Sequence, residues 1–288
     1  MYARSLMPRP VPQSDGRTHD ELRRHYEVEK ELAARLRAAS TDERRTLYTA
    51  LYNELLTRVP GHPLLTTNVD PEASAAIVNA QLRMLEPFIR PGSTFLEIGA
   101  GDCALSIAMA PRVARVYALE VSEEIVRDVS LPENGELLIS NGVDIPLDDH
   151  TIDLAYSNQL MEHLHPDDAQ AQLESIRAVL KRGAPYVCIT PNRLTGPHDI
   201  SGYFEDVPTG FHLLEYSVGS IRRTFQQAGF DSVRVLVGAR GRFTVVPPWP
   251  IVALETGLAR LGAETRRAVV QRLRLNALLG IRVVARAR

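Results

Sequence analysis

Apolar residues along this chain follow two kinds of spacing, which together predict its secondary structure. Short and largely apolar runs predict strands, whereas segments with an apolar residue at every third or fourth position predict amphipathic helices. From about residue 70 onward the runs alternate with helical segments, which favours an α/β fold. The expected strands are residues 94–98, 115–119, 136–140, 152–157, 186–190, 230–237 and 281–285.

Two helices are predicted ahead of this alternation, and both begin with a capping box. Thr18 is followed three residues later by Glu21, and Ser40 is followed in the same way by Glu43. Each side chain of such a pair accepts a hydrogen bond from the backbone N–H group of the other residue, so the pair marks the start of a helix. Residues 17–69 are therefore expected to form an N-terminal helical cap.

The most informative stretch is TFLEIGAGD, residues 94–102, where a strand ends at a glycine turn and a helix follows. Gly99 allows a sharp turn, and Gly101 allows the backbone to come close to a ligand. Glu97 lies two residues before the first glycine, and the next strand ends in Glu120, 21 positions after Gly99. A carboxylate at that second position can accept hydrogen bonds from both hydroxyls of a ribose.

The spacing of Gly99, Gly101 and Ala104 also fits a turn that binds a dinucleotide. Glu97 argues against that alternative, because an acidic side chain aimed into the turn would repel a diphosphate. The sequence therefore favours a nucleoside ligand without a diphosphate at this turn.

LEIGAGD (96–102) followed by VYALEVS (116–122) resembles the first two motifs of class I S-adenosylmethionine-dependent methyltransferases, of the type 11-like group. The resemblance extends over residues 70–230 and the final strand. It implies a doubly wound, seven-stranded sheet that is mostly parallel, with an antiparallel last strand inserted beside the sixth. It also implies S-adenosylmethionine as co-substrate, with Glu97 serving its ammonium end and Glu120 its ribose.

The resemblance places the adenine edge at the turn after the third strand, where Asn141 is the best match and Asp144 an alternative. The cofactor-binding residues expected on this basis are Glu97, Gly99, Ala100, Gly101, Glu120, Val121, Asn141, Gly142, Val143 and Asn158.

The chain is accordingly divided into five parts. Residues 1–16 are expected to be a disordered leader, 17–69 the helical cap, 70–238 the Rossmann-like core, 239–278 a helical insertion and 279–288 the final core strand. The insertion should contain a helix with an apolar face formed by Ile251, Leu254, Leu258 and Leu261. That face packs either on its own domain or on a second subunit, which leaves a homodimer open.

Charge and composition change this picture only at the C-terminal end. The formal net charge is −2, but residues 239–288 hold ten arginines, no lysine and two glutamates. Such a basic segment suits nucleic acid, an anionic lipid or a phosphorylated substrate, although a solvated helix face is the favoured interpretation. Nucleic acid is not expected, because the arginines are not regularly interleaved with the aromatic side chains on which bases stack.

Two further features concern the compartment. The longest apolar run is shorter than the roughly 18 residues that a membrane-spanning helix needs, so no membrane span is expected. Cys103 and Cys188 lie in predicted core elements, which suits reduced thiols in a cytoplasm better than a disulfide.

The candidate chemistry lies at the carboxyl ends of the fourth and fifth strands, where the ligand crevice of such a fold opens. Because the methyl group leaves a sulfonium, positioning the acceptor and removing its proton should supply most of the acceleration. Four of the eight histidines fall in this region, namely His163, His165, His198 and His212. His163 is the first candidate for the base and His198 the second, with a structural hydrogen bond to the loop as the alternative role of His163.

The segment around Glu162 and His163 also allows a metal-binding interpretation. In small-RNA 3′-end and ubiquinone-pathway methyltransferases a Glu-x-x-Glu-His motif in this place binds a divalent cation, and the former add a distant histidine. Here Gln159 stands in place of the first glutamate, and an amide is a weaker ligand than a carboxylate for a hard cation. No metal is therefore predicted, and the candidate ligands, were a cation to bind, are Glu162, His163 and His212.

The long segment 191–214 and the extra helices could close a pocket around a small acceptor. The sequence thus predicts methylation of a small molecule, on oxygen, in the biosynthesis of a secondary metabolite or of a sugar or glycan. The alternatives are C-, N- or RNA methylation with the same donor, and a protein that binds S-adenosylmethionine without turnover.

Overall fold

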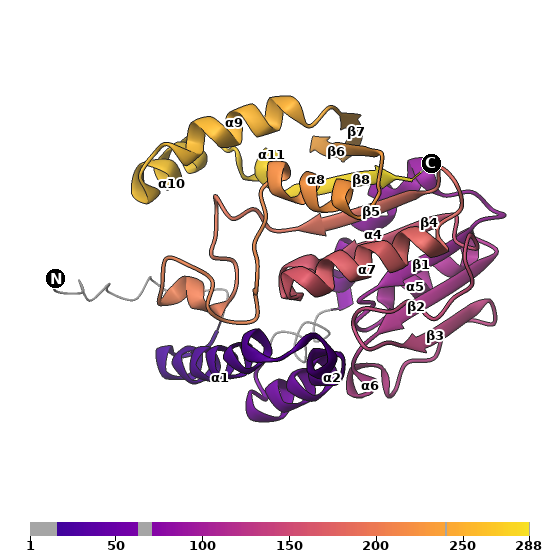
Figure 1. The fold of residues 1–288 in the computed structure, drawn as a ribbon, viewed down its shortest axis with the longest axis horizontal. Coiled ribbons are helices and arrows are strands. Elements are labelled where there is room, and N and C mark those ends of the chain that lie inside the picture. Colours follow the sequence, from indigo (N-terminus) through magenta and orange to yellow (C-terminus); the bar gives the residue numbers. More distant parts are fainter. Residues whose placement is uncertain (1–15, 63–70, 240, 288) are drawn as a thin grey trace.

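The computed structural model describes residues 16–62, 71–239 and 241–287 (Figure 1). Nearly all of the expected leader, and residues 63–70 at the boundary between the expected cap and the core, lie outside these residues. The strands are β1 (Thr94–Ile98), β2 (Arg115–Glu120), β3 (Gly135–Ile139), β4 (Leu154–Asn158), β5 (Pro185–Thr190), β6 (Ser232–Ala239), β7 (Arg242–Val246) and β8 (Ile281–Arg286).

The α-helices are α1 (His19–Ala38), α2 (Thr41–Arg58), α4 (Pro71–Leu85), α5 (Ala104–Met109), α6 (Glu123–Val126), α7 (Pro166–Val179), α8 (Val218–Gln227), α9 (Trp249–Ala259), α10 (Ala263–Arg272) and α11 (Asn276–Leu279). Short 3₁₀ turns follow α4 (Glu86–Phe88), α5 (Ala110–Arg112) and β4 (Met161–His163), and a fourth lies in the loop after β5 (Ile200–Tyr203).

The eight described strands form one sheet in the order β3-β2-β1-β4-β5-β8-β6-β7. The pairs from β3 to β5 are parallel, and β8 is antiparallel to both of its neighbours, β5 and β6. The expected α/β fold with an inserted antiparallel last strand is therefore confirmed. The strand order reverses between β1 and β4, where the crevice of an open α/β sheet forms.

The expectation of seven strands was wrong by one. Residues 242–246, assigned from sequence to the helical insertion, form β7 and pair antiparallel with β6 at the edge of the sheet. Gly241, at a φ of +75°, precedes the strand, and the run Phe243 to Val246 is rich in the β-branched residues that suit a strand. The chain thus extends the sheet with a hairpin before the insertion begins.

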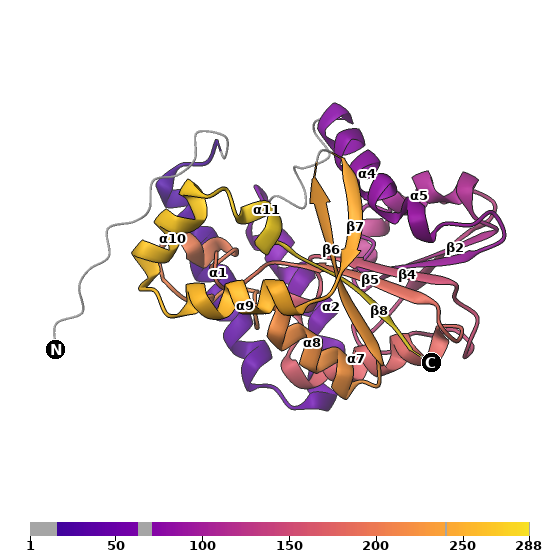
Figure 2. The ribbon, with the colours of Figure 1, turned by 90° about the horizontal axis from the view of Figure 1, so that it is seen from above.

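Helices lie on both faces of the sheet, as Figure 2 shows from above, and alternate residues of a strand point to opposite faces. Phe95, Val187 and Val284 pack in one core with residues of α4 and α5. Leu96 and Cys188 belong to the other core, with residues of α7 and α8. Two buried faces explain why these strands are apolar almost throughout, and they make the sheet doubly wound.

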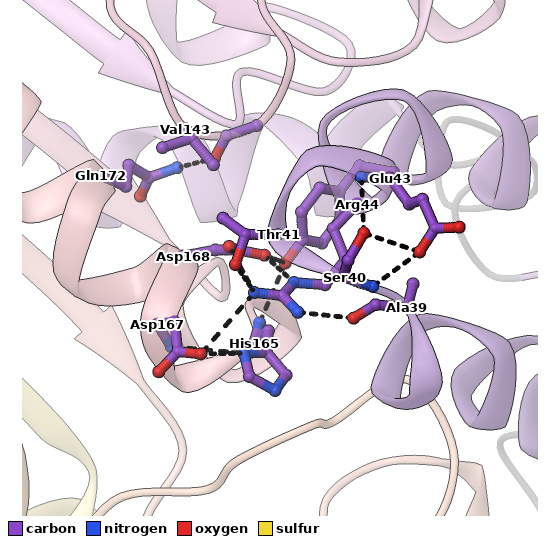
Figure 3. Close-up of polar contacts among 12 residues, drawn as sticks. Ala39, Ser40, Thr41, Glu43, Arg44, Val143, His165, Asp167, Asp168 and Gln172 are labelled. Atoms are coloured by element: carbon purple, nitrogen blue, oxygen red, sulfur yellow. Dashed lines mark hydrogen bonds and ion pairs between the residues drawn. The ribbon is translucent and has the colours of Figure 1, made fainter.

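The N-terminal cap docks on α7 through a buried ion pair (Figure 3). Both predicted capping boxes are present, and the second, at Ser40, starts the helix that carries Arg44. The Arg44 guanidinium donates to both oxygens of Asp168, with Nε–Oδ2 and Nη2–Oδ1 distances of 2.6 and 2.9 Å. The Tyr48 hydroxyl donates to the same carboxylate at 2.7 Å. This clamp fixes α1 and α2 above the crevice.

The insertion forms three helices rather than one, and its apolar face is covered by its own chain. Leu258 packs with Leu194 of the loop after β5, with Val270 and with Leu279, and Leu254 and Leu261 border this cluster. The face that motivated the homodimer alternative therefore has an intramolecular partner. In the described part of the chain, the helices are too short or too polar to cross a membrane.

Candidate active site

A cavity of about 610 Å³ opens at the carboxyl ends of β1, β2 and β4, at the point where the strand order reverses. Its volume lies within the range of small-molecule sites, roughly 300–1,000 Å³. Of the residues expected to bind the donor, those on its wall are Gly99, Gly101, Glu120, Val121, Gly142 and Asn158. The other expected residues, Glu97, Ala100, Asn141 and Val143, lie behind this wall or beside it.

The glycine turn is shaped by two residues in the left-handed region. Gly99 and Gly101 have φ values of +70° and +54°, which other residues adopt only with strain. A Cβ atom built on Gly99 would lie 3.3 Å from Leu160, whereas one built on Gly101 would meet open space. The backbone at Gly101 is therefore accessible to a ligand in the cavity.

Glu120 is held at the edge of this turn by backbone N–H groups. Its carboxylate accepts hydrogen bonds from Gly101 N and Val121 N, both at 2.8 Å, and from Ser122 N at 3.3 Å. Charge-assisted bonds of this kind fix the side chain without neutralising it. The result is an oriented carboxylate on the cavity wall, as a ribose-binding residue requires.

Glu97 lies behind the turn, and its side chain faces the core. Only 6% of the residue is exposed, and Ser106 Oγ donates to its Oε2 at 2.6 Å. Burial raises the pKa of this carboxyl to about 8, against the opposing effect of the Ser106 hydrogen bond. Its expected contact with the donor ammonium stays a prediction.

The turn after β3 is closed by its own side chains. Asn141 Oδ1 accepts from Val143 N and Asp144 N, and Asn141 Nδ2 donates to Asp144 Oδ2 at 2.7 Å. The two alternative residues for the adenine edge thus bind each other. Gln172 of α7 donates to the carbonyl oxygen of Gly142 at 2.7 Å, which holds the turn from the α7 side (Figure 3).

A further part of the cavity wall, below called the histidine end, is rich in histidine. Five of the eight histidines line it: His25, His62, His163, His198 and His212. His165, which sequence placed in the same region, instead caps α7, where its Nδ1 accepts from Asp167 N. His25 and His62 come from the N-terminal cap and were not expected. The signal that could have found them is Glu29, an acidic residue on the inward face of α1, one turn after His25.

His163, the first candidate base, is neutral around physiological pH. Its Nδ1 lies 3.1 Å from the carbonyl oxygen of Phe211, a contact that requires Nδ1 to carry the proton and leaves Nε2 as the acceptor. Burial, followed by the charge of His212, lowers the pKa of His163 to about 3. The ring also meets Tyr52 and His212 edge-on.

Glu215 contacts two further histidines of this end, His212 and His198. Its Oε1 lies 2.8 Å from His212 Nδ1 and accepts from the backbone N–H of His198 at 2.6 Å. Burial lowers the pKa of His212, but the Glu215 hydrogen bond and the charge of Glu162 outweigh it, so the net shift is upward. The His198 ring is held through Nε2 by Thr195 Oγ1 at 2.8 Å and by the Asn192 carbonyl.

Two clusters at this end have the composition of metal sites. Glu162, His163 and His212, below called the glutamate–histidine group, place one ligand atom each within 4.8 Å of one another, and so do His25, Glu29 and His62.

In the glutamate–histidine group the donor set fits a divalent cation. Glu162 Oε1 is buried without a hydrogen-bond partner among the described residues, and both histidines use Nδ1 for an outer contact, which leaves Nε2 as a possible ligand. Gln159, which replaces the motif's first glutamate, supplies no carboxylate. The expected absence of a metal stays a prediction.

In the cluster of the cap both ring nitrogens of His25 are engaged. Its Nε2 lies 2.7 Å from Glu29 Oε1, and its Nδ1 lies 2.7 Å from Arg17 Nη1. Because each nitrogen already has a partner, this cluster is closed by its own hydrogen bonds.

Known proteins supply an independent comparison. Residues 96–188 match the family model described as a methyltransferase domain. No curated protein matches the sequence. Among solved structures, a chain from the complex between the Haloferax volcanii Trm112 methyltransferase activator and a candidate methyltransferase is similar, with a TM-score of 0.51 and 18% identity over 75% of this chain and 94% of that chain.

Two further structures align at slightly lower scores. An S-adenosylmethionine-dependent methyltransferase of Thermotoga maritima has a TM-score of 0.48 and 15% identity over 75% of this chain and 91% of that chain. The phosphoethanolamine N-methyltransferase 2 of Haemonchus contortus has 0.49 and 16% over 73% of this chain and 52% of that chain.

The fold and the family match together define the class of protein. The sheet order, the crevice at β1 and β4 and the likeness to the archaeal structure show the class I methyltransferase fold. Within it, residues 96–188 match the model of a methyltransferase domain, and the resemblance inferred from LEIGAGD is confirmed.

Proposed function

We propose that this protein transfers a methyl group from S-adenosylmethionine to an oxygen of a small molecule, in a biosynthetic reaction of the cytoplasm. The observation that carries the proposal is that one cavity is lined both by the glycine turn with Glu120 and by a cluster of histidines. A donor bound at the glycine turn would therefore share the cavity with candidate bases. A proton acceptor is needed where a hydroxyl is methylated, and histidine is the usual choice.

The donor end is suited to a positively charged nucleoside. The Glu120 carboxylate is fixed by three backbone N–H groups and lies on the wall, where it can accept hydrogen bonds from ribose hydroxyls. Gly101 leaves the backbone open beside it. Glu97 lies behind the turn and holds its proton until about pH 8, so it favours a cation over a diphosphate only when donor binding removes that proton.

At the acceptor end, His163 is the first candidate base and His198 the second. His163 is already in its basic form near neutral pH, because burial keeps its pKa at about 3, and Nε2 is the nitrogen left to accept a proton. His163 would assist removal of the proton from an acceptor hydroxyl through its fixed orientation rather than through a high pKa. His198 lies on the same wall.

Calorimetry with S-adenosylmethionine tests the donor site. Glu120→Gln removes the charge of the ribose-binding residue, so we expect the Kd to rise by about 10- to 100-fold, the equivalent of roughly 1.5–3 kcal/mol for hydrogen bonds to a charged group. Glu136→Gln is the matched control, since Glu136 lies on the neighbouring β3 and pairs with Arg115 at the surface. Equal affinity of Glu120→Gln and the parent would refute the assigned site.

Mass spectrometry tests the reaction. The protein is incubated with cell-extract metabolites and isotope-labelled donor, and the product is expected to be a labelled small molecule with a methoxy group. Label found on a carbon or nitrogen atom, or on RNA, would refute methylation of an oxygen of a small molecule. Donor binding without any labelled product would support a protein that binds S-adenosylmethionine without turnover. Comparison of His163→Ala and His198→Ala then identifies the base, because unchanged turnover in both would leave neither with that role.

A further inference from the structure

A second cavity, of about 480 Å³, adjoins the first on the side of the C-terminal insertion. The loop after β5, the start of β8, and helices α10 and α11 enclose it. Gln159 and His198 line both cavities, so the two spaces meet at these side chains. The second cavity is therefore continuous with the first at Gln159 and His198, the latter one of the histidines that line the first cavity.

Gln159 has a backbone conformation that aims it into this junction. It directly follows β4 with a φ of +54°, a left-handed value that is uncommon for residues other than glycine. Its N–H group donates to the Ile189 carbonyl at 2.9 Å, and its side chain is exposed to the two cavities. Strained residues of this kind concentrate at ligand sites.

The two cavities differ in charge. Among the described residues that line the second cavity, the fully charged side chains are Arg267 and Arg282, with no carboxylate. The first cavity is lined by the three carboxylates of Glu29, Glu120 and Asp199 and by one arginine, Arg17. The space next to the histidines is thus positive, whereas the space that takes the positively charged donor is negative on balance.

The two arginines come from separate elements and are positioned by other groups. Arg267 lies on α10 and donates from Nη2 to Asp206 Oδ1 at 2.8 Å. Arg282 lies on β8 and donates from Nη1 to the Ala277 carbonyl at 3.2 Å. Each guanidinium carries five N–H donors, so these contacts leave donors for an oxyanion in the cavity between them.

From this arrangement we propose that the second cavity is the subsite for an anionic group of the acceptor, a carboxylate or a phosphate bound by Arg267 and Arg282. The acceptor then spans the junction at Gln159, with its hydroxyl near the histidines and its oxyanion in the second cavity. This inference rests on the proposed function and narrows the acceptor to an anionic small molecule. It also gives part of the arginine-rich segment a role in recognition.

Binding of two simple probes tests the subsite. Pyrophosphate and citrate are titrated into the full-length protein at constant ionic strength, and Kd is measured by calorimetry with and without S-adenosylmethionine. We expect at least one probe to bind, and the combined Arg267→Gln and Arg282→Gln substitutions to weaken it by tenfold or more. Preference for pyrophosphate assigns a phosphate, and preference for citrate a carboxylate.

Arg260→Gln is the matched control, because Arg260 is exposed at the end of α9 and does not line the cavity. The single substitution Arg267→Gln, on a helix at the surface, guards against loss of folding through the strand residue Arg282. Failure of both probes to bind the parent, or equal binding by parent and double variant, would overturn the subsite. Donor affinity measured on the same variants should stay unchanged, which separates failure of the subsite from failure of the proposed function.

Discussion

Glu97 provides the most demanding test, because its protonation connects stability with donor binding. The residue is 6% exposed, and burial raises the pKa of its carboxyl from the usual 4.5 to about 8. The folded protein therefore holds the proton up to pH 8, whereas the unfolded chain releases it near pH 4.5. The contribution of this group to the free energy of unfolding is therefore greatest below pH 4.5 and falls as the pH rises toward 8.

The loss of stability that this pKa shift causes at neutral pH is large enough to measure. A shift of this size corresponds to about 3 kcal/mol at pH 7 and about 5 kcal/mol at pH 8 and above, at 1.36 kcal/mol for each pKa unit. Glu97→Gln has no proton to lose, and its amide can still bind Ser106. We expect the variant to gain stability over the parent between pH 5 and 8, measured by chemical unfolding at several pH values. Parallel stability curves over that range would refute the raised pKa.

Donor binding should release the proton that Glu97 holds in the free protein. If Glu97 serves the donor ammonium as a carboxylate, binding at pH 7 must release about 0.9 protons, and affinity must fall nearly tenfold for each pH unit below 8. Calorimetry in buffers of different ionisation enthalpy measures that release, and Glu97→Gln should bind more weakly and release none. Ser106→Ala is the matched variant, since loss of a hydrogen bond that lowers the Glu97 pKa should move the pH dependence upward. Tight binding by the parent with no proton release would contradict this role.

Three further outcomes are expected. Asp168→Asn removes the negative charge that pairs with the buried Arg44, so the free energy of unfolding should fall by ~3–5 kcal/mol in denaturant titrations. Asp167→Asn, at a largely exposed side chain, should change that free energy little. Gly142→Ala should lose ~1–2 kcal/mol and weaken donor binding, because Gly142 has a φ of +84° and a Cβ atom there would lie 3.1 Å from Tyr48. Exhaustive chelation should leave both donor affinity and turnover intact, whereas a loss of turnover restored by Mg²⁺ or Mn²⁺ would place a cation on the glutamate–histidine group.

The core fold could be predicted because its signals are local. Apolar runs, the capping boxes and the glycine turn each specify a few residues of backbone. Through one family resemblance they indicated a doubly wound sheet with an antiparallel last strand beside the sixth. β7 was missed because its strand character depends on pairing with β6. Residues 242–246 are half exposed at the sheet edge, so they lack the continuous apolar run that marked the buried strands.

The candidate site likewise has one part with a local sequence signal and one part that depends on contacts between distant segments. Its donor end lies within two consecutive strand–turn units, so Gly99 and Glu120 could be identified from spacing alone. The acceptor end is assembled from segments more than a hundred residues apart, and His25 reaches it only because the cap docks on α7. No pattern within one segment could reveal that contact. The low pKa of His163 is equally a property of packing, since it arises from burial and a neighbouring histidine.

The docking of the cap has a consequence for how the donor site is built. Tyr48 of α2 donates to Asp168 of α7, its hydroxyl accepts from the backbone N–H of His165, and its ring lies against Gly142. Gln172, one turn further along α7, holds the carbonyl of Gly142. The turn expected to meet the adenine therefore contacts both the cap, through Tyr48, and α7, through Gln172. A substitution that loosens the cap should weaken donor binding as well as acceptor binding, because the same tyrosine supports both the clamp and the turn.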